Sequence, residues 1–306
     1  FGHPSTAAQR LNFDLNGGVR TISFNSFSTN ESIGSSQFMQ FYGSISGGAG
    51  SGLNIDGSGI HIFRLSNSYT GVTTINNGRL QVNEAGGLGA SGAGNGTVVN
   101  SGGQVMLQAA GTWAENFTLA GTGNSWNSSG ALVVLGAFSP TLAGEVTIAA
   151  SGARLGVVGG QTLSSTNRIT GSGNIELVRG GGTGVGSFTF SGTNHDYTGS
   201  VTIGTNARLN AGTIQSFGAT NGQTIVESGG EVSLTASYTT AENFSIAGAG
   251  SGGAASALTV SSGQTVIFNG NISLTAGASV GGAGGGDHNG ALSGSFDLNK
   301  VGAGHW

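Results

Sequence analysis

Short runs of alternating apolar and polar residues recur along nearly the whole chain. Examples are Arg79–Val82, Phe117–Leu119 and Val201–Ile203, and each run is bounded by Gly, Asn or Ser. This pattern predicts short β-strands that bury one face and expose the other to water, with tight turns between them. No glycine-free window of about eleven residues has a helical apolar period, so we expect no amphipathic α-helix.

The predicted strands belong to a long internal repeat. Residues 114–117 (Ala-Glu-Asn-Phe) return as residues 241–244, and residues 99–105 return as residues 226–232, in both cases 127 positions later. Repeats of this kind are typical of arrays in which successive units stack on one another. The architecture is therefore the first question that the sequence poses.

A Tyr-Thr-Gly motif is part of the same repeat. It occurs at Tyr69, Thr70 and Gly71 and returns 128 positions later at Tyr197, Thr198 and Gly199. We predict that these six residues have a structural role.

A glycine-rich element with paired apolar residues precedes each Tyr-Thr-Gly motif, and its copies begin near Leu53, Ile175 and Phe296. These junctions divide the chain into a series of units in one continuous solenoid without linkers. The predicted units are the end of one at 1–44, a second at 45–168, a third at 169–291 and the start of a further one at 292–306.

The pattern predicts an all-β solenoid built from tandem units of about 122–128 residues. Glycine accounts for 62 of 306 residues, and a coiled chain needs glycine at its sharp corners. With roughly 20 residues per coil, we expect about six coils per unit and about fifteen in the chain. Aliphatic residues should stack inside, with Thr, Ser and Asn outside. Tandem β-sandwich domains remain the alternative, although the glycine content is high for them.

Charge and hydropathy exclude several functional classes. The chain has a net charge of −4 and only 7% charged residues, and its few basic residues are scattered, so a nucleic-acid partner is not expected. No apolar run approaches the roughly 18 residues of a membrane helix, so we expect no membrane span in this segment. The chain has no cysteine and therefore no disulfide bonds.

The residues from Gly57 through Tyr69-Thr70-Gly71 to Leu80 resemble the autotransporter-associated β-strand repeat of bacterial passenger proteins. A second copy runs from Phe188 to Leu209, and a third begins at Leu298. The resemblance implies a right-handed parallel β-helix that is extracellular or held on the outer surface of a bacterium. The motif specifies an architecture and an export route, and it implies no particular activity.

Two patterns resemble catalytic motifs but lack their context. Ser279 lies in a Gly-x-Ser-x-Gly pattern, which requires a strand leading into a helix, and here a glycine run follows. His195-Asp196 resembles part of a catalytic triad, but it precedes Tyr197 where the first copy has Asn67-Ser68, so we predict an exposed turn.

Metal-binding patterns are equally weak. Residues 281–287 approximate a calcium nonapeptide, but the pattern occurs once and its Asp287 is one position late, so we predict a flexible glycine loop. Glu115 and Glu242 are repeat-equivalent, which favours a turn or ladder role over catalysis. We expect no catalytic residue, no bound metal and no cofactor. We therefore expect that the chain is not an enzyme. The histidines lack zinc spacing and should be surface or turn residues: His3, His61, His195, His288 and His305.

The sequence leaves three functions open. We favour a non-enzymatic structural protein of the bacterial cell exterior, a rod or fibre segment that self-associates end to end or laterally. The first alternative is an adhesin that binds glycans, proteins or other cell surfaces through its repeated outer face. A polysaccharide-active β-helix enzyme is the less favoured alternative. A row of exposed Tyr or Trp would favour adhesion, whereas a polar Thr/Asn/Ser exterior would favour a structural role; Trp113, Trp126 and Trp306 are expected in buried or edge positions.

Overall fold

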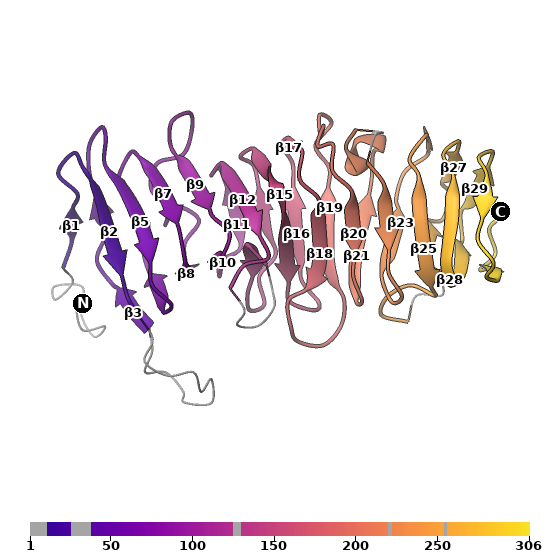
Figure 1. Ribbon diagram of the computed structural model, residues 1–306, viewed down its shortest axis with the longest axis horizontal. Coiled ribbons are helices and arrows are strands. Elements are labelled where there is room, and N and C mark those ends of the chain that lie inside the picture. The colour runs from indigo at the N-terminus through magenta and orange to yellow at the C-terminus, as the bar shows by residue number, and fades with distance from the viewer. Residues whose placement is uncertain (1–10, 26–37, 125–129, 220–221, 254–255) are drawn as a thin grey trace.

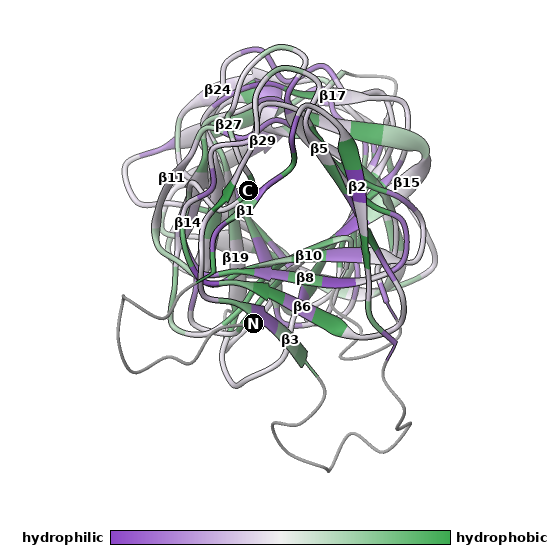
Figure 2. Cartoon of the chain, turned by 90° about the vertical axis from the view of Figure 1, so that its left-hand side faces the viewer, coloured by the Kyte–Doolittle hydropathy of each residue, from purple (hydrophilic) through white to green (hydrophobic). Residues whose placement is uncertain are grey.

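The computed structural model describes residues 11–25, 38–124, 130–219, 222–253 and 256–306. In these parts the regular secondary structure is nearly all β, and parallel strands stack in about 11 turns as a β-solenoid. The result is the rod seen in Figure 1. Seen from the N-terminal end in Figure 2, the chain winds clockwise away from the viewer, so the coil is right-handed. The predicted parallel β-helix is confirmed, and the sandwich alternative is wrong because the described strands pair in parallel.

Each turn of the solenoid has three sides, called here faces 1, 2 and 3 in chain order (Figure 2). On face 1, the stack is interrupted after β17, where the 3-10 helix η3 (Ile214–Phe217) occupies one turn. It resumes as a separate three-stranded sheet. The strands of face 1 are β2 (Val19–Ser23), β5 (Gly52–Asp56), β7 (Val72–Ile75), β9 (Gly96–Val99), β12 (Phe117–Gly121), the start of β15 (Val146–Val157), β17 (Ile169–Gly171), β24 (Tyr238–Thr240), β27 (Thr265–Phe268) and β29 (Gly285–His288).

Face 2 is the longest uninterrupted stack. Its strands are β3 (Phe38–Phe41), β6 (Ile60–Phe63), β8 (Gly78–Val82), β10 (Gly103–Leu107), β13 (Leu132–Val134), the end of β15, β18 (Ile175–Arg179), β20 (Val201–Ile203), β22 (Thr224–Val226), β25 (Phe244–Gly248), the start of β28 (Ile272–Gly282) and β30 (Leu292–Ser293).

Face 3 completes the triangle. Its strands are β1 (Phe13–Asp14), β4 (Ile45–Ser46), β11 (Gly111–Trp113), β14 (Pro140–Leu142), β16 (Thr162–Ser165), β19 (Gly186–Phe190), β21 (Ala207–Ala211), β23 (Glu231–Leu234), β26 (Leu258–Val260), the end of β28 and β31 (Leu298–Val301).

The core is a set of aliphatic ladders that run along the rod axis. Parallel pairing in register places an inward residue of one turn directly against the inward residue of the next. The alternation of each strand therefore becomes a continuous apolar column. On face 2 this column consists of the buried residues Val105, Leu132, Leu155, Leu177, Ile203, Val226, Ile246 and Leu274.

The expectation of about fifteen coils of roughly 20 residues is wrong. The shortest turns do have that length, as between Leu53 and its partner Thr73, but Phe117 pairs with Val146, 29 positions later. Longer turns carry loops at their corners, such as 83–95, and these loops use residues without adding a strand to the stack. About 11 turns at about 4.8 Å each give a rod on the order of 50 Å long.

The sequence repeat rotates around the rod. The three equivalent segments near Leu53, Ile175 and Phe296 lead into β5 on face 1, β18 on face 2 and β31 on face 3. Each step covers five full turns and one further face. Equivalent residues of successive units therefore lie on different faces of the rod.

Candidate functional site

The tyrosines of the Tyr-Thr-Gly motif lie inside the rod. Tyr69 and Tyr197 are both fully buried, whereas the neighbouring Thr70 and Thr198 are exposed. The Tyr69 hydroxyl lies 2.5 Å from Oγ1 of Thr73, and the Tyr197 hydroxyl donates to the carbonyl oxygen of Ser216 at 2.8 Å. Burial raises the pKa of both phenols. These side chains anchor the corner to the core and offer no ring to an external ligand.

The motif glycines are required by the spacing of the turns. A Cβ on Gly71 would lie 2.0 Å from the carbonyl oxygen of Ser51 in the preceding turn, and a Cβ on Gly199 would lie 2.1 Å from that of Gly173. Both obstacles are backbone atoms of a stacked turn, so a side chain has no room without shifting the coil.

Two buried acid–hydroxyl pairs occupy equivalent positions in the two units. Thr97 Oγ1 donates to Glu115 Oε1 at 2.8 Å, and Thr224 Oγ1 donates to Glu242 Oε1 at 2.9 Å. Glu115 is 3% exposed and Glu242 2%. Burial raises the pKa of each carboxyl to about 7, and the threonine hydrogen bond opposes the shift only in part. Sequence reasoning noted the repeated glutamates but missed their burial. The repeated threonine 18 positions upstream was the available signal.

His195 and His61 correct the prediction that the histidines are surface or turn residues. His195 is 3% exposed, and its Nδ1 accepts the Ile169 backbone N–H at 2.9 Å, which fixes that nitrogen as unprotonated. Burial lowers the pKa of His195 to about 4. His61 is fully buried, and burial lowers its pKa as well. Each histidine occupies an inward-facing position of the coil. The local sequence does not reveal that these positions face inward.

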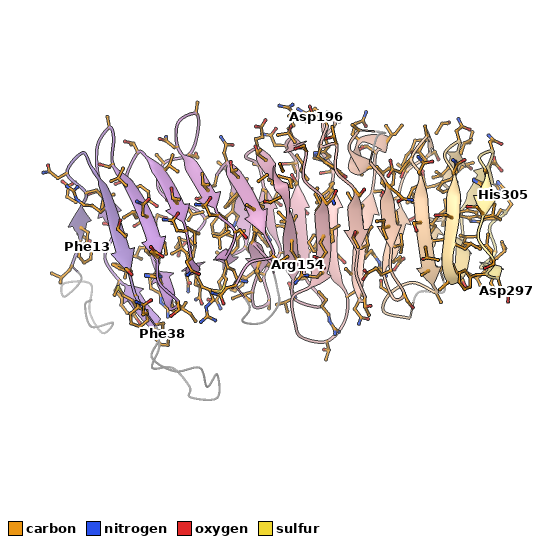
Figure 3. The ribbon with its side chains drawn as sticks, in the orientation of Figure 1. Phe13, Phe38, Arg154, Asp196, Asp297 and His305 are labelled. Atoms are coloured by element: carbon orange, nitrogen blue, oxygen red, sulfur yellow. The ribbon has the colours of Figure 1, made fainter. Side chains whose placement is uncertain are left out.

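Asp196 points away from its neighbour His195. It is exposed at the outer rim of the rod (Figure 3) and is bound by the guanidinium of Arg168, whose hydrogen bond lowers the pKa of Asp196. The His–carboxylate contact of a catalytic triad is therefore absent, since Asp196 engages Arg168 on the outside while His195 binds backbone inside.

The other sequence motifs lie within strands. Ser279 is 8% exposed in β28 and pairs with Asn299, so it is not on a strand-to-helix elbow. The expected flexible glycine loop at 281–287 is wrong, because Gly281–Gly282 ends β28 and Gly285–His288 forms β29. Stacking against β27 orders this segment. Within the described ranges, no group of three or more His, Asp or Glu side chains is arranged to hold a metal ion.

A shallow polar groove lies over the outer surface of face 2 and its corner with face 1. It measures about 340 Å³ and is lined in part by Thr122, Ser151, Asn174, Glu176, Thr202 and Glu227. The Glu176 carboxylate accepts from Nε of Arg154 at 2.8 Å, so one of its two acids is already paired. The groove offers amide, hydroxyl and carboxylate oxygens to solvent without an aromatic platform.

Other charged side chains pair between turns. Arg208 Nε donates at 2.8 Å to Glu231, which is buried, and Arg168 joins Glu145 and Asp196 on the outside of the rod. Figure 3 shows the labelled charged residues along the outside of the rod, from Arg154 in the middle to Asp297 at the C-terminal end. Largely exposed pairs such as those of Arg168 contribute little to stability, typically below about 1 kcal/mol each.

Aromatic side chains do not form an exposed row. Trp113 is fully buried and Trp306 stacks on Phe268, with ring centroids 5.1 Å apart, as expected for buried or edge positions. No tyrosine or tryptophan in the described ranges is classed as exposed. Trp126 and His3 lie outside the described residues.

Comparison with known proteins identifies no relative. No protein-family model, no curated protein and no solved structure matches the chain. Across the part of the chain that the structure describes, no helix has the length and apolar character needed to cross a membrane.

Proposed function

We propose that this chain is a segment of a non-enzymatic structural rod of the bacterial cell exterior, which associates with further copies through its ends. The observation that supports it best is the uninterrupted core of stacked apolar ladders along about 11 turns. Such a core makes the rod rigid. It also allows a long rod, because each turn contacts only its neighbours and further turns can be added to the stack. The placement at the cell exterior rests on the resemblance of the Tyr-Thr-Gly segments to bacterial passenger repeats.

The exposed apolar residues support association through the ends. Six large hydrophobic residues are exposed in the described ranges. Four of them belong to the two terminal turns: Leu11 and Val19 at one end, Leu292 and Phe296 at the other. A strand edge that no neighbour covers pairs readily with another strand. A further turn, supplied by the array itself or by a second copy, would cover these four apolar residues.

Electron microscopy and sedimentation of the purified chain test this proposal. We expect single rods on dilution and rods of doubled and tripled length at higher concentration. Val19→Lys and Phe296→Lys should each suppress the rods of doubled and tripled length, because each places a charge in one of the two ends that would contact each other. Ile214→Lys, an exposed apolar position in the middle of the rod, is the matched control and should leave the length distribution unchanged. Single rods at every concentration would contradict end association.

Glycan binding through the polar groove is the second candidate. Its carboxylate, amide and hydroxyl groups match the hydrogen-bonding needs of a polyhydroxylated chain. On an array of defined oligosaccharides, we expect any bound glycan to lose at least about tenfold in affinity with Glu227→Ala or Asn174→Ala, since either change removes one polar partner. Glu84→Ala, an exposed glutamate elsewhere on the rod, should not change binding. If the wild-type chain binds no glycan on the array, this candidate function is wrong.

A further inference from the structure

Three glutamates are buried in the described ranges, and Glu231 is paired with Arg208. The other two, Glu115 and Glu242, share one local arrangement on different sides of the rod. Glu115 follows β11 and bonds to Thr97 on face 1, whereas Glu242 follows β24 and bonds to Thr224 on face 2. In both copies the acid and the threonine are 18 positions apart, and so they lie on adjacent turns. The arrangement therefore belongs to the repeat and is reproduced wherever the repeat places it.

The main chain of both glutamates is closely stacked against the next turn, and both residues are buried. In the following turn, a Cβ on Gly144 would lie 2.0 Å from the carbonyl oxygen of Glu115, and a Cβ on Gly270 would lie 2.0 Å from that of Glu242. The buried Tyr69 and Tyr197 lie near enough for the respective glutamate charge to raise the phenol pKa further, after burial itself. Each carboxyl group is thus buried beside a threonine hydroxyl and near a neutral phenol.

The charged residues near Glu115 and Glu242 in the next turn have other partners and do not pair with either glutamate. Glu145, in the turn after Glu115, directs its carboxylate to Arg168, and Asn271 stands in its place in the second copy. Beyond Gly270, the His288 ring lies 3.2 Å from the Gly270 carbonyl oxygen. Among the ion pairs of the described chain, neither Glu115 nor Glu242 takes part.

We propose that Glu115 and Glu242 are proton-binding sites inside the rod, which make the stability of the solenoid depend on pH. A buried carboxyl group without a cation is best accommodated in its neutral form. Protonation thus removes a charge from the interior, and ionisation near neutral pH leaves a charge that one threonine hydrogen bond solvates only in part. Because every full copy of the repeat would carry one such site, the effect grows with the number of units.

The direction of the effect follows from proton linkage. The pKa of each carboxyl rises from an ordinary 4.5 to about 7 in the folded chain, so the folded state binds more protons than the unfolded state between these values. The stability contribution of the pair is present in full below about pH 4.5, falls as the pH rises toward 7, and is lost above it. Buried His195 and His61, whose pKa values are lowered, act in the opposite direction, because acid favours their protonation in the unfolded chain.

The experiment compares the full chain with its E115Q/E242Q variant in thermal unfolding from pH 5 to pH 8. Glutamine resembles the neutral acid, so the two proteins should have similar Tm at pH 5, and the variant should be more stable at pH 8 by on the order of 5 °C. The histidine contribution is common to both proteins and cancels in the difference. The single variants E115Q and E242Q should each give about half the effect.

Matched controls and a direct readout separate this proposal from a general effect of charge removal. E84Q/E227Q removes one exposed glutamate from each unit and should give a Tm difference from wild type that does not vary over this pH range. Infrared spectroscopy should detect a protonated carboxyl band above pH 6 in wild type that is missing from E115Q/E242Q. A pH-independent Tm difference, or the absence of that band, would overturn the proposal.

Discussion

Replacing Gly199 with alanine is expected to destabilise the solenoid by about 3 kcal/mol, the upper part of the usual range for overpacking. The new Cβ would lie 2.1 Å from the carbonyl oxygen of Gly173 and 2.4 Å from its carbonyl carbon, both in the turn below. Main chain cannot rotate away as a side chain can, so the turns must separate and lose neighbouring contacts. The midpoint of urea or thermal unfolding, followed by circular dichroism at 218 nm or so, measures the loss.

Gly277→Ala is the matched control for the glycine prediction. Gly277 is exposed, and its nearest obstacle is the Asp297 carbonyl oxygen, 3.9 Å from an added Cβ. Its backbone also lies outside the left-handed region, so alanine should change stability by less than about 0.5 kcal/mol. An unfolding midpoint for Gly199→Ala that equals that of Gly277→Ala would show that the turns are not packed as closely as the structure indicates.

Phe244→Ala should lower the unfolding free energy by about 3–5 kcal/mol, because it leaves a large cavity in the core. Phe244 is fully buried and lies edge-on to two other rings, with centroid distances of 5.4 Å to Phe217 and 5.7 Å to Phe268. These rings belong to three successive turns. Removing the middle ring therefore weakens contacts on both sides, and the C-terminal turns beyond it should open first.

Phe296→Ala deletes the same side chain from a site that is 49% exposed. At dilutions that keep the rods separate, its cost should stay below about 1 kcal/mol, since little apolar area is re-exposed. Hydrogen exchange measured segment by segment would show which strands each of the two substitutions destabilises. Phe244→Ala should accelerate exchange in β25, β27 and β28, and uniform protection along the rod would contradict a nearest-neighbour stack.

The sequence predicted the strands and the core because their signals are local. Alternation at Arg79–Val82 or Val201–Ile203 specifies which side chains face inward. Parallel pairing then places the inward residues of one turn against the inward residues of the next. The same repeat predicted a structural role for the Tyr-Thr-Gly residues, whereas the burial of Tyr69 and Tyr197 is seen only in the structure. Corner residues are different, since a residue that follows a turn can face either way.

His195 and Asp196 illustrate this limit at the candidate site. They are adjacent in sequence, yet one ring is inside the core and the other side chain pairs with Arg168 on the outside. Glu115 and Glu242 belong to the same class, because both follow a corner and both turn inward to a threonine of another turn. Their raised pKa depends on desolvation by neighbouring turns, which no local pattern encodes.

By itself, the sequence determined the all-β solenoid, its inward ladders and the existence of a repeat, because two-residue alternation and recurring glycine motifs are properties of the chain read in order. The number of turns, the rotation of each unit by one face and the burial of the polar corner residues were decided only by the tertiary structure. These features depend on how many residues each corner uses and on which turn then lies above it, and stacking of the whole coil sets both.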